Sequence, residues 1–412
     1  MDSKALPWNE FFRVFSLTAY CPVMKAIALF CLSLSLVLGV ALVAVGSEDT
    51  PLRRVDPMSL EQQSSEPGLL PDESLTSLSQ RQTLLAAIAH SLHYLQTPAA
   101  AEDYRQHPVP GITRDRVQRS LERFRQLVLA HPDPTQLQIA VLREFDLYQA
   151  IGTDGVGTVE FTGYFEPTYR ASRVRTAEYQ YPLYRVPPNL AQWAQPHPTR
   201  LQLEGTDGLQ GSAGLLRGLE MVWLSDRLEA FLVQVQGSAR LQLTDGSTMT
   251  VGYAGRTEYP YTSLGRELVN DGKFTLEELS LPVLIQYFEQ NPVDLNLYIP
   301  RNNRFVFFQE TRGSAAIGSL GVPVTAERSI ATDKSLMPPG ALALIQTQVP
   351  DVNPAGELEP QLVSRFVLDQ DTGGAIRGAG RVDIFMGTGE QAGDRAGLIN
   401  GTGQLYYLLL KD

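Results

Sequence analysis

One stretch decides how this chain folds: Phe366-Val-Leu-Asp-Gln-Asp371-Thr-Gly-Gly-Ala-Ile-Arg377-Gly-Ala-Gly-Arg381-Val-Asp383-Ile-Phe-Met-Gly387. Its two apolar runs are rich in β-branched and aromatic residues, which predicts two strands joined by a glycine-rich turn. Three acidic residues, Asp369, Asp371 and Asp383, lie in or beside the ends of these strands. Such acids are either loop residues exposed to water or groups with a chemical role, and the rest of the chain helps to choose between these interpretations.

The composition is that of an ordinary globular protein. With 412 residues, 43% of them hydrophobic and 19% charged, the chain is long enough for two domains with sizeable cores. Its net charge is −11 and its Lys and Arg residues form no run, so it would repel the phosphates of a nucleic acid. We therefore expect no nucleic-acid partner.

Residues 26–46 form an uncharged apolar run, which matches the roughly 20 residues of one membrane crossing. Lys25 precedes the run and Glu48 and Asp49 follow it, which favours a cytoplasmic N-terminus and export of the remainder. The same run also fits the core of a signal peptide cleaved after Ala44-Val-Gly46. We expect an exported protein of the periplasm or cell envelope, anchored in the membrane by this segment if it is not cleaved.

The part of the chain that we expect to be exported contains no cysteine, and the C-terminal half contains no histidine. Both cysteines, Cys21 and Cys31, lie in or beside the apolar run, so the exported part has no thiol nucleophile, thiolate zinc site or disulfide. All five histidines precede residue 198, so the C-terminal half has none for a catalytic triad or a metal site. Carboxylates are left as the groups that can carry the chemistry.

Local patterns predict helices first and strands afterwards. Residues 47–78, rich in Ser, Pro, Gln and Glu, have the composition of a linker. Three amphipathic helices are expected next, over 80–96, over 114–130 with Thr113 as N-cap, and from Asp133-Pro134 through Phe145. One further helix is expected over 275–289, among short strands at 159–165, 181–186, 231–235, 241–243, 249–251, 304–308, 341–345, 365–368, 382–385 and 405–409. Many short strands separated by Gly and Pro are typical of β-barrels.

Three motifs suggest other chemistry. Gly387-Thr-Gly389-Glu-Gln-Ala392 fits a dinucleotide fingerprint, but the acidic residue needed about 20 positions later is missing, and a tight turn into a short helix over 390–396 is the better interpretation. Asp371-Thr-Gly373 matches the motif of aspartic peptidases, which here would need a second carboxylate from a homodimer. Asp333, Asp371 and Asp383 could also bind a hard metal ion, although their apolar neighbours disfavour a ligand-rich loop.

From about residue 80 to its end, the chain resembles the membrane-bound lytic murein transglycosylase A family, and its last hundred residues resemble the three-Asp (3D) domain of that family. The matching motifs occur in order: Thr162-Gly-Tyr-Phe-Glu-Pro167, Tyr181-Pro-Leu-Tyr-Arg-Val-Pro-Pro188, Val235-Gln-Gly-Ser238, Tyr253-Ala-Gly255, Asn303-Arg-Phe-Val-Phe-Phe308, Val322-Pro-Val, Arg328-Ser-Ile-Ala-Thr-Asp333, Pro338-Pro-Gly340, Asp371-Thr-Gly-Gly-Ala-Ile-Arg-Gly378, Arg381-Val-Asp383 and Ala392-Gly-Asp-Arg-Ala-Gly397.

The resemblance implies a mainly β fold with peripheral N-terminal helices and a glycan-binding groove between two β domains. A double-ψ β-barrel would combine residues 312–412 with a first strand that follows the helices in 79–168, and residues 169–311 would form an inserted β-barrel-like domain. Residues 1–46 would be the membrane or signal segment and 47–78 the linker. The implied substrate is the peptidoglycan glycan strand, cut by a monomer that uses no cofactor and no metal.

The resemblance also assigns roles to residues. Asp383 falls on the catalytic position, as an acid and then a base in forming a 1,6-anhydro sugar. That role requires a raised pKa, which Val382, Ile384 and Phe385 could provide by desolvation if Arg381 points away. The substrate-binding candidates, expected at strand ends or in turns, are Thr162, Tyr164, Gln236, Gly237, Ser238, Tyr253 and Asp371, and the structural or orienting candidates are Asp333 and Arg381. A non-catalytic wall-binding protein remains the alternative from another class.

Overall fold

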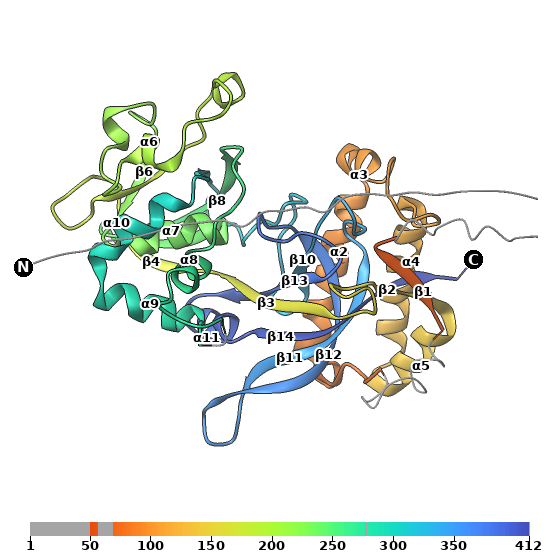
Figure 1. Cartoon of the computed structure of the whole chain (residues 1–412). Helices are drawn as coiled ribbons and strands as arrows, with labels where there is room; N and C mark the ends of the chain where they lie inside the picture. Colours follow the sequence, from red (N-terminus) through yellow and green to blue (C-terminus); the bar gives the residue numbers. More distant parts are fainter. Residues whose placement is uncertain (1–49, 57–68, 277, 412) are drawn as a thin grey trace, which may run out of the picture. The chain divides into compact units, whose positions relative to one another are not determined.

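The computed structural model describes residues 50–56, 69–276 and 278–411 (Figure 1). The predicted membrane or signal segment, residues 26–46, and parts of the predicted linker lie outside these residues. Within them, no helix combines the length and the apolar character needed to cross a membrane.

A closed β-barrel contains the C-terminal stretch. Its strands are β3 (Val159–Glu166), β10 (Ser329–Ala331), β11 (Leu342–Val352), β12 (Leu358–Asp371), β13 (Arg381–Thr388) and β14 (Asn400–Leu410). The order around the barrel is β14-β11-β12-β10-β13-β3, and β3 pairs with β14 to close it. β3 runs parallel to β13, and β10 runs parallel to β12. The barrel confirms the predicted mainly β class, whereas the groove beside it stays a prediction.

The barrel sheet continues beyond β14. β2 (Phe145–Ala150) pairs with β14, and β1 (Leu52–Val55) pairs with β2. The prediction of a linker over 47–78 is therefore wrong at β1, because Leu52 is buried and Arg54 forms an ion pair of 2.6 Å with Asp146. Phe145, predicted within the third helix, instead begins β2.

The three predicted N-terminal helices are confirmed and pack on the barrel sheet (Figure 1). α2 (Leu78–Leu95) contacts β12, α4 (Arg114–Ala130) contacts β14, and α5 (Pro134–Glu144) contacts β2. The hydroxyl of Thr113 accepts a hydrogen bond from the backbone N–H of Arg116 and so caps α4, as predicted. The core is continuous, since the ring of Phe124 on α4 lies 4.9 Å from that of Phe366 on β12. Two short elements, η1 (Glu73–Thr76) and α3 (Pro98–Asp103), complete this region.

A second sheet is built from the residues between β3 and β10. Its strands are β4 (Thr168–Ser172), β5 (Tyr181–Tyr184), β6 (Glu220–Leu224), β7 (Ser238–Leu243), β8 (Thr248–Arg256) and β9 (Val306–Glu310). The order is β5-β6-β4-β7-β8-β9, and a bridge from Arg185 to Phe308 joins the two ends. A tight turn at Asp245-Gly246 connects β7 and β8, with Gly246 at φ 85°.

Helices and short turns cover this second sheet. The helices are α6 (Arg200–Glu204), α7 (Arg227–Gln236), α8 (Leu264–Asn270), α9 (Leu281–Gln290) and α10 (Leu295–Tyr298), and the 3-10 turns are η2 (Leu190–Gln192), η3 (Gly211–Ala213), η4 (Pro292–Asp294) and η5 (Ile299–Arg301). The helix predicted over 275–289 begins later, at Leu281, where Ser280 caps it. α11 (Glu390–Gly397) follows β13 and confirms the short helix predicted after the tight turn.

The strand predicted at 231–235 is wrong, because these residues belong to helix α7. Asp226 caps its start by accepting a hydrogen bond from the N–H of Glu229, and Gly237 ends it in the left-handed conformation at φ 80°. Phe231 packs with the neighbouring helices, while Val233 packs on the second sheet. A helix buried on two sides shows a continuous apolar run, which periodicity alone does not distinguish from a strand. The other predicted strands are all observed.

Candidate active site

Asp383 lies on β13, directly opposite Thr162 on the parallel strand β3. Val382 and Ile384 point into the barrel core and are buried, so strand alternation directs Asp383 to the other face. The hydroxyl of Thr162 donates a hydrogen bond to Oδ1 of Asp383. The side chain of Asp383 is 21% exposed, so the carboxyl group is largely desolvated and can still be reached by a ligand.

Burial raises the pKa of the Asp383 carboxyl above its usual range, because the charged form loses its hydration. The nearby Arg381 guanidinium and the hydrogen bond from Thr162 oppose this shift, while the negative charge of Asp371 adds to it. Arg381 does not point away, as the prediction required: its Nε lies 3.8 Å from Oδ1 of Asp383. The raised pKa therefore persists beside a cation because desolvation outweighs the attraction.

Asp371, at the end of β12, is held by three hydrogen bonds. Its Oδ2 accepts from the hydroxyl of Tyr164 at 2.8 Å, and its Oδ1 accepts from the backbone N–H groups of Ser319 and Thr372, both at 2.8 Å. Burial raises the pKa of Asp371 although these donors oppose the shift. The ring of Tyr164 packs against Phe385, with centroids 5.2 Å apart. Asp371 is thus fixed in place, close enough to influence Asp383 by its charge.

Asp333 fastens the loop that leads into β13. Its Oδ1 accepts hydrogen bonds from the N–H and hydroxyl of Ser335, at 3.1 and 2.7 Å, and its Oδ2 accepts from the N–H of Gly378 at 2.9 Å. Burial alone would raise the pKa of Asp333, but these hydrogen bonds and Arg377 hold it below the usual range. Such contacts suit the structural role predicted for Asp333.

Asp369 was singled out in the sequence without a role, and the structure places it inside the barrel. Its side chain is fully buried and forms an ion pair with Lys334. Its Oδ2 also accepts hydrogen bonds from the hydroxyls of Thr332 at 2.8 Å and Tyr407 at 2.7 Å. This network ties β12 to β14 and to the segment that carries Asp333.

Gln236, Gly237 and Ser238 lie where α7 meets β7, so the expectation that Gln236 lies at a strand end is wrong: it is the last residue of a helix. Its Oε1 accepts a hydrogen bond of 3.2 Å from the N–H of Phe165 on β3. This contact connects the second sheet to the strand that carries Thr162. Ser238 is buried, with 8% of its surface exposed.

Tyr253 and Thr162 also lie within strands and not at their ends. Tyr253 is in β8, next to a register shift that precedes Gly255, and its side chain is 49% exposed. An exposed aromatic ring on an irregular strand is a suitable surface for a sugar face. Thr162 owes its position to the parallel pairing of β3 with β13.

The sequence predictions missed Tyr261 and Arg304. Burial raises the pKa of Tyr261, while a hydrogen bond with Ser263 and the charges of Arg381 and Arg304 oppose the shift. Arg304 is 7% exposed and its Nε donates a hydrogen bond of 2.8 Å to the carbonyl of Tyr259. Arg304 belongs to the matching motif that begins at Asn303, but the apolar residues of this motif indicated only a strand.

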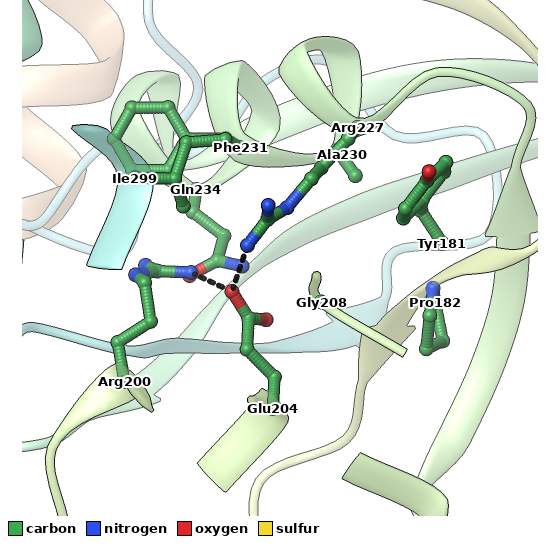
Figure 2. A pocket seen from close by; sticks show the side chains of 10 residues that line it. All are labelled: Tyr181, Pro182, Arg200, Glu204, Gly208, Arg227, Ala230, Phe231, Gln234 and Ile299. Atoms are coloured by element: carbon green, nitrogen blue, oxygen red, sulfur yellow. Dashed lines mark hydrogen bonds and ion pairs between the residues drawn. The ribbon is translucent and has the colours of Figure 1, made fainter. Parts of the chain in front are cut away.

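A small pocket lies elsewhere, in the second sheet's region (Figure 2). Arg200 donates to Glu204 at 3.1 Å, while Nη2 of Arg227 is 4.0 Å from the same carboxylate. Nε and Nη2 of Arg227 have no hydrogen-bond partner among the described residues. The pocket measures about 10 Å³, which is room for one water molecule. None of the predicted site residues lines it, so it is a structural cluster and not the centre of the site.

The acids of the site do not form a metal cluster. In the described ranges, no group of three or more His, Cys, Asp or Glu side chains is arranged to hold a metal ion. The carboxylate oxygens of Asp333 and Asp371 instead accept hydrogen bonds from backbone N–H groups and hydroxyls.

Two family models match the chain. The model of the MltA specific insert domain matches residues 160–309, and that of the 3D domain matches residues 328–409. The membrane-bound lytic murein transglycosylase A of Escherichia coli K12 is 32% identical over 272 residues, which cover 65% of this chain and 70% of that protein.

Solved structures show the same fold. A crystal structure of E. coli MltA with bound chitohexaose aligns with a TM-score of 0.64 and 24% identity, covering 88% of this chain and 96% of that one. The membrane-bound lytic murein transglycosylase from Agrobacterium tumefaciens aligns with a TM-score of 0.64 and 25% identity, covering 83% and 97%.

Proposed function

Because this chain belongs to the membrane-bound lytic murein transglycosylase A family, we propose that it cuts peptidoglycan strands with Asp383 as its only acid and base. The bond cut is the β-1,4 bond from N-acetylmuramic acid to N-acetylglucosamine, and the product ends in a 1,6-anhydro sugar. The observation that carries this proposal is the Asp383 carboxyl, which is desolvated, raised in pKa and still partly exposed. A carboxyl group in this state keeps a proton that it can donate.

In the first step, Asp383 gives its proton to the glycosidic oxygen of the leaving N-acetylglucosamine, and the bond from that oxygen to C1 of the muramyl sugar breaks. Thr162 donates to Oδ1, and in the described part of the chain no hydrogen bond reaches Oδ2. Oδ2 is therefore the oxygen that carries the proton.

In the second step, the Asp383 carboxylate removes the proton from the C6 hydroxyl of the same muramyl sugar while O6 bonds to C1. The carboxyl group is thereby restored and no water is consumed. Arg381, 3.8 Å from Oδ1, stabilises the carboxylate between the two steps.

A second catalytic carboxylate is not required for this reaction. Ordinary glycosidases need one as a nucleophile or to activate water. Here the attacking hydroxyl is part of the substrate ring, so its effective concentration is high without a base for water. Asp371 is the nearest candidate, but both of its oxygens are taken by Tyr164, Ser319 and Thr372. Its role is to hold the site and to keep Asp383 protonated through its charge.

Substrate contacts are proposed for the residues around Asp383. Chitohexaose, bound in the E. coli structure, is a neutral β-1,4-linked glycan, which supports a glycan strand as the ligand. Tyr253 would offer its exposed ring to a sugar face, and Gln236, Gly237 and Ser238 would border the strand near β3. We place the enzyme in the cell envelope as a monomer without a cofactor, anchored by residues 26–46 if these are retained.

The test is to incubate the full chain with purified murein and to analyse the products by mass spectrometry. We expect 1,6-anhydromuropeptides from the natural sequence, and a loss of rate of about 10²- to 10⁴-fold in Asp383→Asn with murein binding retained. Binding without any anhydro product would identify a wall-binding protein instead. Unchanged activity of Asp383→Asn would remove Asp383 from the mechanism.

A further inference from the structure

Three arginines lie in or against the loop between Asp371 and Asp383: Arg377 and Arg381 belong to this segment, and Arg304 packs against Gly374. Arg381 pairs with Asp383 and Arg377 with Asp333, each at 3.8 Å. In the part of the chain that the structure describes, neither Arg256 nor Arg304 forms an ion pair.

Arg304 is held against the loop by close contact. A Cβ atom on Gly374 would lie 1.5 Å from Nη1 of Arg304, so the guanidinium rests directly on the backbone of this glycine. Its Nε is engaged by the carbonyl of Tyr259 at 2.8 Å, which fixes the plane of the group. Arg304 therefore reaches from the second sheet to the loop that carries the acids of the barrel.

Arg256 is the neighbour of Arg304. It is the last residue of β8, paired with Val306 at the start of β9, two residues after Arg304. Burial, followed by the charges of Arg256 and Arg377, lowers the pKa of Arg304 to about 10. An arginine that is 7% exposed and unpaired is a costly arrangement unless an anion comes to it.

The substrate offers such an anion. A muramyl sugar carries a lactyl ether, whose carboxyl group is either free or linked to a peptide with carboxylates of its own. N-acetylglucosamine has no such group. Gly374, against which Arg304 packs, lies in the loop that joins Asp371 to the strand carrying Asp383, so Arg304 contacts the segment that links the two acids.

We propose that Arg304, assisted by Arg256, binds a carboxylate of the muramyl residue and so aligns that sugar, and not N-acetylglucosamine, with Asp383. This inference rests on the proposed function. A planar guanidinium fixed by Tyr259 and Gly374 can receive a carboxylate at low entropic cost. The two arginines are specificity residues, whereas Arg381 serves Asp383.

The test compares ligands that differ in charge. Binding to the full chain is measured by calorimetry in an Asp383→Asn background, which prevents turnover, with chitohexaose, peptide-free glycan strands and peptide-bearing strands. We expect Arg304→Gln to weaken binding of one or both muramyl ligands by about 10- to 100-fold and that of chitohexaose by less than about twofold. A larger loss on peptide-free strands identifies the lactyl carboxylate, and a larger loss on peptide-bearing strands identifies the peptide.

Arg256→Gln provides a second variant on a half-buried side chain, for which we expect a smaller loss of the same selectivity. Arg217→Gln, an exposed arginine before β6, is the matched control and should bind all ligands normally. Equal losses on chitohexaose and muramyl strands, or no loss on either, would refute the inference. If the natural sequence yields no anhydro product, the proposed cleavage fails, yet the charge dependence of binding still decides this inference.

Discussion

Replacing Thr162 by valine tests the acid role of Asp383 without touching the acid. Valine has nearly the shape of threonine, so the change removes the hydroxyl that donates to Oδ1 and little else. This hydrogen bond favours the carboxylate over the carboxylic acid, and it lowers the pKa of Asp383. Its loss must therefore raise that pKa further.

The size of the shift follows from the contact. A hydrogen bond to a charged group contributes about 1.5–3 kcal/mol, and one pKa unit corresponds to about 1.36 kcal/mol. Asp383 is 21% exposed, so water replaces part of the lost interaction and the lower end of the range applies. We expect the pKa of Asp383 to rise by about one unit.

The assay is the pH dependence of kcat/KM on murein strands, followed by the release of anhydro ends. Since the acid must be protonated to act, its ionisation in the free enzyme sets the limb at which activity falls with rising pH. In Thr162→Val this limb should move to higher pH by about one unit, whereas Thr162→Ser, which keeps the hydroxyl, should leave it in place. A limb that stays, or moves to lower pH, in the valine variant would refute the assignment of Asp383 as the acid.

Three further outcomes follow from the other contacts. Asp371→Asn removes a negative charge that raises the pKa of Asp383, so the same limb should move to lower pH in a titration of kcat/KM. Asp369→Leu leaves Lys334 without its carboxylate partner and should reduce the free energy of unfolding in urea by about 3–5 kcal/mol. A loss below about 1 kcal/mol would contradict a stabilising role of this ion pair. Arg200→Met should cost about 3–5 kcal/mol in the same assay because it breaks buried hydrogen bonds to Glu204 and two carbonyls. Within the ranges that the structure describes, Arg227→Met removes only one hydrogen bond, to Asn296, and an ion pair of 4.0 Å with Glu204, so it should cost less; equal losses would contradict this comparison.

Local chemistry predicted the helices well and the position of one strand badly. Thr113 and Asp133 predict the start of their helices, because their side chains cap the first turn that follows. The residue that predicts each helix thus lies within a few residues of the turn that it caps. Residues 231–235 carry no local signal of this kind. Whether such an apolar run becomes a helix or a strand depends on what packs on both of its sides. β1 was missed for a similar reason, since its pairing partner lies about a hundred residues away in β2.

The sequence indicated which acids form the candidate site, but not how the side chains around them are oriented. The scarcity of cysteine and histidine left the acids, and the ordered motifs distinguished Asp383 from Asp371 and Asp333. Orientation was not predictable: Arg381 lies beside the acid because both project from β13 at alternate positions on the same face. The contact of Arg304 with the loop was not predictable, because the glycine against which it packs, Gly374, is seventy residues further along the chain.

The pairing of β3 with β13 brings together Thr162 and Asp383, which are 221 residues apart in sequence. The whole second sheet lies between these two residues in the sequence, so closing the barrel must bring together strands on either side of this long insertion. Contacts of such long range form late, because the entropy of closing the loop must be overcome first. Until closure, Asp383 is an ordinary solvated acid with neither the buried environment nor the hydroxyl that prepare it. A chain in which β3 and β13 have not yet paired therefore lacks the environment in which Asp383 is proposed to act.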